Sequence, residues 1–343
     1  MKPMSTFVRA AFVCSSIALP ATAFAQASDF YAGKRITMIV GTAAGGGYDT
    51  YARMIARYMP AHIPGQPTFV VQNMPGAGSN VSAAYIQNVA PKDGTFIGSY
   101  QSGLVLEPLI GSRPINHDPS KAQYLGSAND DIYICIARSD APVKEFKDAL
   151  TTEMVMGASN SSSTSDYSMM FNAILGTKFK IVLGYQGSRQ ISLAIEKGEA
   201  HGACGFAWPS ISVTQPGQFE SGALKVIAQA HSIGHPDLNR KGVPLAGDFA
   251  RSPEDKAVLD FFFSQTRFGR PFAVADGVPV ERVAILRKAF AATMEDPQLR
   301  AEAEKMKLDI DYVKGEDLQA LVAKIYAAPP GVIERTKAAL NPK

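Results

Sequence analysis

The chain has 343 residues, of which 46% are hydrophobic, so it is long enough for two globular domains with ordinary cores. Its formal net charge of +3 is too small to indicate a nucleic-acid-binding protein, and the sequence has no lysine- and arginine-rich run with interleaved aromatic residues. We therefore expect no nucleic-acid partner.

The N-terminal segment has the pattern of an export signal. Lys2 and Arg9 make it basic, residues 10–19 are mostly apolar, and Ala23 and Ala25 have the spacing of a signal-peptidase site. The apolar run is well short of the roughly 20 residues that a membrane-spanning helix needs, which argues against the alternative, a signal anchor. We expect residues 1–25 to be a signal peptide cleaved near Ala25, and the mature protein to lie in the periplasm.

The first predicted unit of strand, loop and helix spans residues 35–58. It begins with a short apolar run that is typical of a buried strand. The loop then ends in Gly45, Gly46 and Gly47, and Tyr48 and Asp49 open the helix, with Asp49 as the expected N-cap. Glycine lets a ligand approach the backbone, and the free N–H groups of a helix N-terminus favour an anion, so we expect an anion site here. A tight turn without a ligand is the alternative, because one glycine motif is weak evidence.

The same unit occurs a second time. Residues 68–73 form a short strand, which leads through a loop of small residues into a helix, and a third strand over residues 95–100 ends in polar side chains. Because such loops lie at the carboxyl ends of strands in one α/β layer, we expect them to face a single ligand. The candidate ligand-binding residues are Gly76, Ala77, Gly78, Ser79 and Asn80 in the second loop, and Gln101 and Ser102 after the third strand.

These segments, in this order, resemble those of the Bug family, the extracytoplasmic solute-binding proteins of tripartite tricarboxylate transporters. The first loop is similar to the family's Gly-Gly-x-x-Asp pattern with one more glycine, and residues 73–78 match Asn-x-Pro-Gly-Ala-Gly residue by residue. Pro-Lys-Asp-Gly-Thr follows at residues 91–95, and the similarity covers nearly all of the mature chain. The family usually places prolines where this chain has Gly-Thr-Ala-Ala at residues 41–44, so the first loop departs from the family pattern.

The second half of the chain carries a hydroxyl-rich loop in a similar setting. The loop follows a predicted strand at residues 154–158 and precedes a helix that starts near Asp166. Hydroxyl groups and the N–H groups of a first helical turn can together bind a carboxylate, and the Bug family has a Gly/Ser-rich loop here. A solvated serine linker is the alternative. The candidate residues are Ser161, Ser162, Ser163, Thr164 and Ser165.

Further candidates depend on the resemblance. The family usually has a basic residue where this chain has Gln186, and Arg189 could replace it or could pair with surface carboxylates. Trp208, at the end of a strand, could line the pocket or fill the core. Arg267 and Arg270 lie on a segment where the family is mostly apolar, and either guanidinium could bind an anionic ligand.

Two cysteines follow the signal segment, Cys135 and Cys204, each in an apolar run. They could pair in an oxidising compartment, but we favour two separately buried thiols. The sequence has no Cys-x-x-Cys motif and no cluster of metal-ligating residues, so we expect no metal and no cofactor.

The resemblance implies an α/β, two-lobed fold like that of periplasmic binding proteins, with the ligand cleft between the lobes and two crossover strands. We expect domain 1 to comprise residues 26–126 and 233–343, and domain 2 to comprise residues 127–232.

The implied function is capture of a small carboxylate, such as a di- or tricarboxylate or an aromatic acid, for delivery to the membrane components of a tripartite tricarboxylate transporter. We expect a monomer without enzymatic activity. A periplasmic hydrolase is one alternative, although the chain lacks Gly-x-Ser-x-Gly and His-Glu-x-x-His motifs, and Gly-x-Gly-x-x-Gly is absent from the first loop. A solute sensor that docks on a receptor is another.

Overall fold

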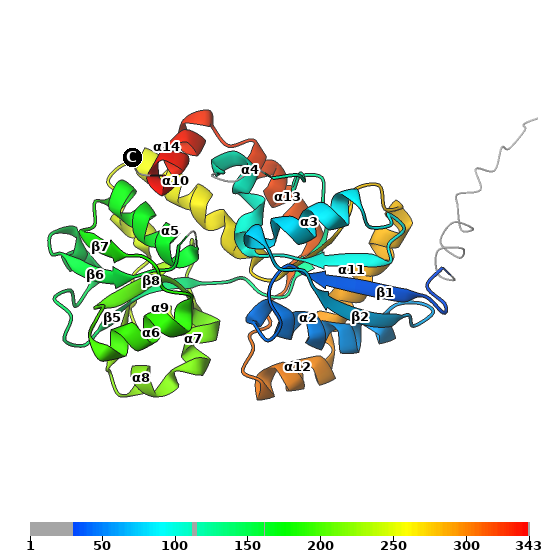
Figure 1. Cartoon of the computed structure of the whole chain (residues 1–343), viewed down its shortest axis with the longest axis horizontal. Coiled ribbons are helices and arrows are strands. Elements are labelled where there is room, and N and C mark those ends of the chain that lie inside the picture. Colours follow the sequence, from blue (N-terminus) through cyan, green and yellow to red (C-terminus); the bar gives the residue numbers. More distant parts are fainter. Residues whose placement is uncertain (1–29, 112–114, 161, 342–343) are drawn as a thin grey trace, which may run out of the picture.

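The computed structural model describes residues 30–111, 115–160 and 162–341, and it has two lobes, each built on its own mixed β-sheet (Figure 1). The expected two-lobed α/β fold is therefore confirmed. The predicted signal peptide and the candidate Ser161 lie outside the described residues. Within the described ranges, no helix has the length and apolar character needed to cross a membrane.

Lobe 1 is built on a six-stranded sheet in the order β11-β4-β10-β3-β1-β2. The strand β1 runs parallel to β2 and β3, whereas β10 runs antiparallel to β3 and β4. Residues 36–40 of β1 are all buried, as expected for a central strand covered on both faces. The strands are β1 (Arg35–Val40), β2 (Thr68–Asn73), β3 (Phe96–Ser99), β4 (Gln123–Ser127), β10 (Pro271–Val274) and β11 (Val313–Lys314).

The helices of lobe 1 follow its strands. The parallel strands β1, β2 and β3 lead respectively into α2, into α3 and into a short 3₁₀ helix at Ser102–Val105, so their loops share one edge of the sheet. The helices are α2 (Gly47–Tyr58), α3 (Asn80–Asn88), α4 (Glu107–Ile110), α11 (Val280–Glu295), α12 (Pro297–Lys305) and α13 (Gly315–Tyr326).

Lobe 2 is built on a five-stranded sheet in the order β7-β6-β8-β5-β9. The strand β6 runs parallel to β7 and β8, whereas β5 runs antiparallel to β8 and β9. The strands are β5 (Tyr133–Arg138), β6 (Met154–Gly157), β7 (Phe179–Val182), β8 (Gly202–Ala207) and β9 (Leu224–Ala230). The helices are α5 (Ser163–Met170), α6 (Ser188–Lys197), α7 (Trp208–Thr214), α8 (Pro216–Glu220), α9 (Pro236–Arg240) and α10 (Pro253–Phe263).

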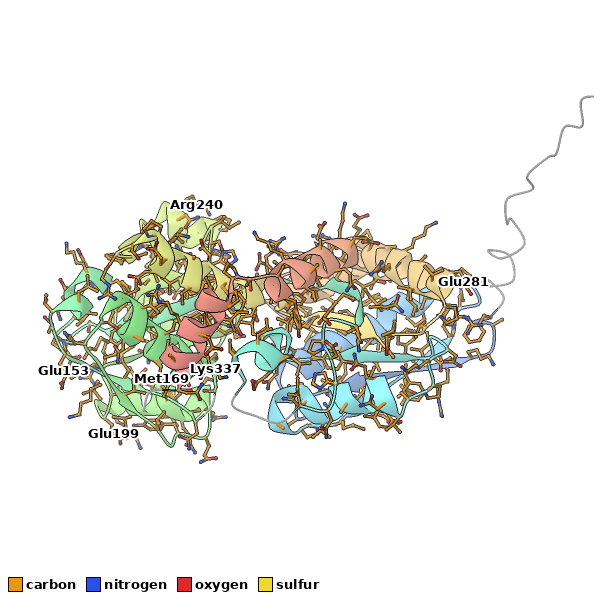
Figure 2. All side chains as sticks on the ribbon, turned by 90° about the horizontal axis from the view of Figure 1, so that it is seen from above. Glu153, Met169, Glu199, Arg240, Glu281 and Lys337 are labelled. Carbon is orange, nitrogen blue, oxygen red and sulfur yellow. A yellow bond between two sulfur atoms is a disulfide. The ribbon has the colours of Figure 1, made fainter. Side chains whose placement is uncertain are left out.

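The chain crosses between the lobes at residues 128–132, which join β4 to β5, and returns at residues 264–270, which lead into β10. A third connection follows α13, because the C-terminal helix α14 (Pro330–Leu340) packs on α4 of lobe 1 and also on α5 and α10 of lobe 2. Figure 2 shows Lys337 of α14 near Met169 of α5. The predicted domain boundaries stay a prediction, but these contacts and the burial of Leu238 of α9 in the core of lobe 2 favour assigning α9, α10 and α14 to the second lobe.

Cys135 and Cys204 form a disulfide, so the expectation of two separate thiols is wrong. The two residues face each other on the antiparallel strands β5 and β8, and both are buried. The sequence shows that both cysteines lie on strands, but it does not show the pairing register that brings them together.

Candidate functional site

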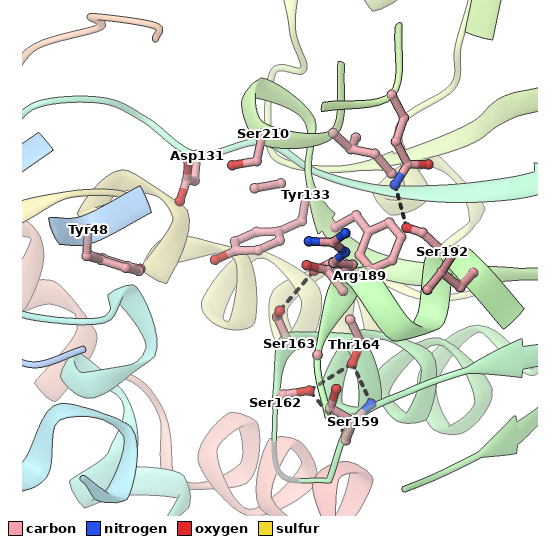
Figure 3. A pocket seen from close by; sticks show the side chains of 18 of the residues that line it. Tyr48, Asp131, Tyr133, Ser159, Ser162, Ser163, Thr164, Arg189, Ser192 and Ser210 are labelled. Atoms are coloured by element: carbon pink, nitrogen blue, oxygen red, sulfur yellow. Dashed lines mark hydrogen bonds between the residues drawn. The ribbon is translucent and has the colours of Figure 1, made fainter. Parts of the chain in front are cut away.

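A cavity of about 700 Å³ lies between the lobes (Figure 3). Most of its wall belongs to lobe 2, while Tyr48 and Arg270 come from lobe 1. A second cavity of about 390 Å³ shares Tyr48, Tyr133, Ser162 and Ser163 with the first and extends along lobe 1 past Gln101. The two cavities together form an interlobe cleft, and we refer to them as the larger and the smaller cavity.

Three helix N-termini of lobe 2 meet at the larger cavity. The helices α5, α6 and α7 follow the parallel strands β6, β7 and β8, so all three begin at the same edge of the sheet. Residues from the first turn of each helix line the cavity: Thr164 of α5, Arg189 of α6 and Ser210 of α7. Free N–H groups and helix dipoles make this edge suited to negative charge.

The hydroxyl-rich loop is held in place by its own side chains. Ser162 and Ser165 form a capping box at the start of α5, and the N–H of Ser159 donates to Oγ1 of Thr164 at 2.9 Å. The Oγ of Ser163 donates to the carbonyl of Gly205 on β8 at 2.9 Å. Only glycine fits there, because the φ of Gly205 is +76° and an added Cβ would lie 2.1 Å from the carbonyl oxygen of Ser163.

One hydroxyl group of this loop, at the cavity wall, makes no hydrogen bond to the described residues. The Oγ of Ser159 is buried and has no hydrogen-bond partner among the described residues. A buried polar group without a partner costs free energy, and a polar ligand would relieve that cost. The loop is therefore a preorganised wall of hydroxyl and N–H groups.

Arg270 forms a buried ion pair with Asp131 across the two crossing segments. Their side chains are 6% and 1% exposed, and the guanidinium lies 4.4 Å from the ring centroid of Tyr48 and 5.3 Å from that of Tyr51. Burial opposes the charge on Arg270, but Asp131 and the tyrosines outweigh it and raise the pKa of the guanidinium. Burial raises the pKa of Asp131, although Arg270 acts in the opposite direction. The charge of Arg270 is thus already balanced by Asp131 within the fold.

Arg270 nevertheless faces the ligand space. It lines the larger cavity, and its Nε has no hydrogen-bond partner within the described part of the chain. The residue is 5% exposed, so this donor is withheld from bulk water. Arg270 can therefore donate a hydrogen bond to a ligand while Asp131 neutralises its charge.

Arg189 is the cation that the cleft leaves unpaired. It lies in the first turn of α6, lines the larger cavity and forms no ion pair with any described residue. Gln186, which precedes it, does not line either cavity, and its side-chain amide donates to the carbonyl of Gly184. Arg189, rather than residue 186, therefore places a positive charge in the wall of the larger cavity.

The first glycine loop supports the site from outside the cavity. The N-cap of α2 is Gly46, so the expectation that Asp49 caps this helix is wrong. Asp49 is buried in the first turn, where it accepts hydrogen bonds from the N–H of Gly45 at 2.8 Å and from Nε of Arg53 at 2.9 Å. Burial alone would raise the pKa of Asp49, but these bonds and one from Asn73 hold it below its usual value.

The second loop, residues 76–79, has a strained backbone and is held in place by Ser79. Gly76, Ala77, Gly78 and Ser79 all have positive φ. Ser79 is fully buried and donates to the carbonyl of Gly41 at 3.1 Å, while it accepts from the N–H of Gln101 at 3.0 Å. It therefore ties together the loops after β1, β2 and β3, which explains how a residue away from the cavity fixes the rim.

The candidate residues from the sequence fall into two groups. Those that line the cleft are Tyr48, Gly78, Gln101, Ser102, Ser162, Ser163, Thr164 and Arg270. Those that line neither cavity are Gly45, Gly46, Gly47, Asp49, Gly76, Ala77, Ser79, Asn80, Ser165, Gln186 and Trp208. Trp208 is 9% exposed and packs on Phe219 with ring centroids 5.4 Å apart, so it fills the core.

The sequence interpretation missed Asp131, Tyr133, Ser159 and Ser210, which also line the larger cavity. Asp131 lies on the segment that joins β4 to β5, and Tyr133 is the first residue of β5. The crossing segments of a two-lobed protein border its cleft. Polar residues on these segments could therefore have been predicted as ligand-binding candidates. Among the residues described, no group of three or more His, Cys, Asp or Glu side chains is placed to hold a metal ion.

No family model matches the chain. A curated protein of Agrobacterium vitis, the UPF0065 protein in the TAR-I ttuE-ttuC' intergenic region, is 30% identical over 169 residues, which cover 46% of this chain and 47% of that protein. This match thus spans about half the length of the Agrobacterium protein. The UPF0065 protein in the gbd 5'region of Cupriavidus necator is 24% identical over 327 residues, which cover 93% of this chain and 91% of that protein.

Three solved structures share this fold with the chain. A TctC solute-binding protein from Polaromonas has a TM-score of 0.68 at 22% identity and covers 89% of this chain and 99% of its own. The periplasmic binding protein BugD has a TM-score of 0.64 at 21% identity, with coverage of 90% and 98%. MatC from Rhodopseudomonas palustris with bound malate has a TM-score of 0.61 at 18% identity, with coverage of 90% and 99%. The resemblance to the Bug-type proteins is confirmed at the level of the fold.

Proposed function

We propose that this chain, which has the two-lobed fold of the Bug-type solute-binding proteins, binds a small carboxylate in its interlobe cleft without converting it. The observation that carries the proposal is the larger cavity, where Arg189 and three helix N-termini of lobe 2 face Tyr48 and Arg270 of lobe 1. A ligand that contacts both lobes stabilises the closed arrangement, as in other hinged binding proteins. The bound malate of MatC, a protein of the same fold, supports a carboxylate ligand.

The cellular role follows from the same resemblance. An exported, monomeric protein would collect the acid in the periplasm and deliver it to the membrane components of a tripartite tricarboxylate transporter. The pattern of residues 1–25 supports export. Binding rather than catalysis is supported by the cleft lining, because its described residues include no histidine or cysteine that could pair with the serines as a base or nucleophile.

A melting-temperature screen tests the proposal. The protein is unfolded and refolded to remove any bound solute and is then heated with mono-, di- and tricarboxylates. An acid present at about 100 times its dissociation constant should add about 2.7 kcal/mol to the free energy of unfolding. No shift with any acid, or chemical conversion of the recovered acid detected by mass spectrometry, would contradict the proposal.

Replacing Arg189 is expected to weaken carboxylate binding selectively. Arg189→Ala removes the unpaired guanidinium from the cavity wall, and a charge-assisted hydrogen bond contributes about 1.5–3 kcal/mol. The dissociation constant measured by calorimetry should therefore rise about 10- to 150-fold. The melting temperature of the ligand-free protein should hardly change, because Arg189 is exposed and forms no ion pair with the described residues.

Lys197→Ala is the matched control for this prediction. Lys197 is an exposed cation in the last turn of the same helix, and it lines neither cavity. The Lys197→Ala variant should bind the acid as tightly as the parent protein does. An equal loss of affinity in the two variants would mean that the net positive charge of the protein, rather than a contact with Arg189, attracts the ligand.

A further inference from the structure

The charged side chains that line the cleft are mostly acidic. Four carboxylates and two guanidinium groups contribute to the walls: Asp131, Glu196, Arg189 and Arg270 in the larger cavity, and Glu107 and Asp166 in the smaller one. Arg270 is neutralised by Asp131, so Arg189 is the one described cation of these walls without an ion-pair partner. Arg189 therefore offers a place for one negative charge, and Glu196 in the same wall opposes a second.

The helix α6 arranges these groups in order along the cavity. Arg189, Leu193 and Glu196 all line the larger cavity and follow each other at helical spacing, one about every turn. The helix thus presents a cation, then an apolar side chain, then a carboxylate whose Oε1 accepts from Gln218 at 3.1 Å. Glu196 lies seven positions after Arg189, a rise of about 10 Å along the helix. A ligand lying along α6 would meet Glu196 at the end opposite to Arg189.

The wall of the larger cavity also has an apolar part that a ligand could contact. Leu193 is 45% exposed, and among the exposed large apolar side chains of the described chain it is the one that lines this cavity. Phe206 and Ile211 lie in the same wall. An apolar side chain left in water inside a cavity indicates a ligand with apolar surface to cover it.

We infer that the ligand is a monocarboxylate with an apolar body, bound with its carboxylate at Arg189 and its body against Leu193. The inference rests on the proposed function and specifies its substrate class. A dicarboxylate of the same length would place its second charge near Glu196, so the cleft selects against it. This differs from malate, the dicarboxylate held by MatC.

Hexanoate and adipate test the charge part of the inference, because they share a six-carbon chain and differ by one terminal carboxylate. The refolded protein should bind hexanoate about tenfold more tightly than adipate by calorimetry, because a like charge a few ångströms away at a protein surface costs at least about 1 kcal/mol. Glu196→Gln should narrow this difference by strengthening adipate binding. Adipate binding as tightly as hexanoate to the parent would overturn the inference and leave the proposed function intact. If neither these acids nor the wider carboxylate set binds, the proposed function itself fails.

Leu193 tests the apolar part. Leu193→Asn should weaken hexanoate binding about tenfold through lost apolar burial. Leu183→Asn is the control, because Leu183 is 47% exposed in the same lobe but lines neither cavity. Both variants should melt near the parent temperature, since both side chains are partly in water. Unchanged hexanoate binding in Leu193→Asn would refute contact between the ligand body and this wall.

Discussion

Arg270→Ala is expected to lower the free energy of unfolding by about 3–5 kcal/mol, because it leaves a buried carboxylate without its counter-charge. Asp131 is 1% exposed, and among the described residues it keeps only the hydrogen bond from Nδ2 of Asn129, at 3.1 Å. The variant also loses the contacts of the guanidinium with the rings of Tyr48 and Tyr51. Denaturant unfolding at neutral pH measures the loss.

The pH dependence separates this cause from a simple packing defect. Burial already raises the pKa of Asp131 above its unfolded value, and removing Arg270 takes away the group that opposes this shift. Ionised Asp131 therefore destabilises the variant most at neutral pH, and the loss shrinks as the pH falls and the folded carboxyl takes up a proton. A loss that does not change with pH would indicate packing instead.

Arg267→Ala is the control for the ion pair. Arg267 also joins the crossing segments, by donating to Asp130 at 2.6 Å, but its side chain is 43% exposed. Asp130 keeps His231 as a partner, with Nε2 at 3.1 Å from the carboxylate. Because Arg267 lies partly in solvent and Asp130 keeps a partner, a smaller loss than that of Arg270→Ala is expected. Equal losses in both variants would contradict the assignment of Arg270–Asp131 as the principal ion pair.

Removing the disulfide is the second change with a large expected effect. Cys135→Ala combined with Cys204→Ala should lower the free energy of unfolding by about 4 kcal/mol, because the bond closes a loop with a sequence separation of 69 and restricts the unfolded chain. The measurement compares denaturant unfolding of the mature parent and the double variant under oxidising conditions.

Reduction of the parent supplies the control for the disulfide. The reduced parent should unfold close to the double variant, since both lack the covalent link. A double variant as stable as the oxidised parent would mean that the bond contributes nothing to the unfolding equilibrium. Ligand binding by the double variant should stay near that of the parent, because neither cysteine lines the cleft.

The units of strand, loop and helix could be predicted because their signals are local. The apolar run of β1, the small residues before α3 and the hydroxyl-rich start of α5 each lie within a few residues of the element that they specify. The Bug-type motifs then indicated how the units assemble.

The roles of individual side chains could not be read in the same way. Asp49 has the sequence position of a cap, but its carboxylate binds the loop and Arg53 because the backbone places Gly46 at the N-cap. Arg270 looks like a free cation until the fold brings Asp131 from the other crossing segment beside it. Such pairings depend on contacts between residues far apart in the chain, which composition and periodicity do not encode.

The position of α14 bears on the rate at which a solute enters and leaves the cleft. The two crossing segments are tied to each other by Arg270–Asp131 and Arg267–Asp130, so they act as one axis, whereas α14 bridges the lobes through α4, α5 and α10. Any rotation about that axis must slide α14 along one of these neighbours, and the work of doing so adds to the barrier for opening. If the cleft opens by such a rotation, we expect the packing of α14, which lines neither cavity, to lengthen the residence time of a bound solute.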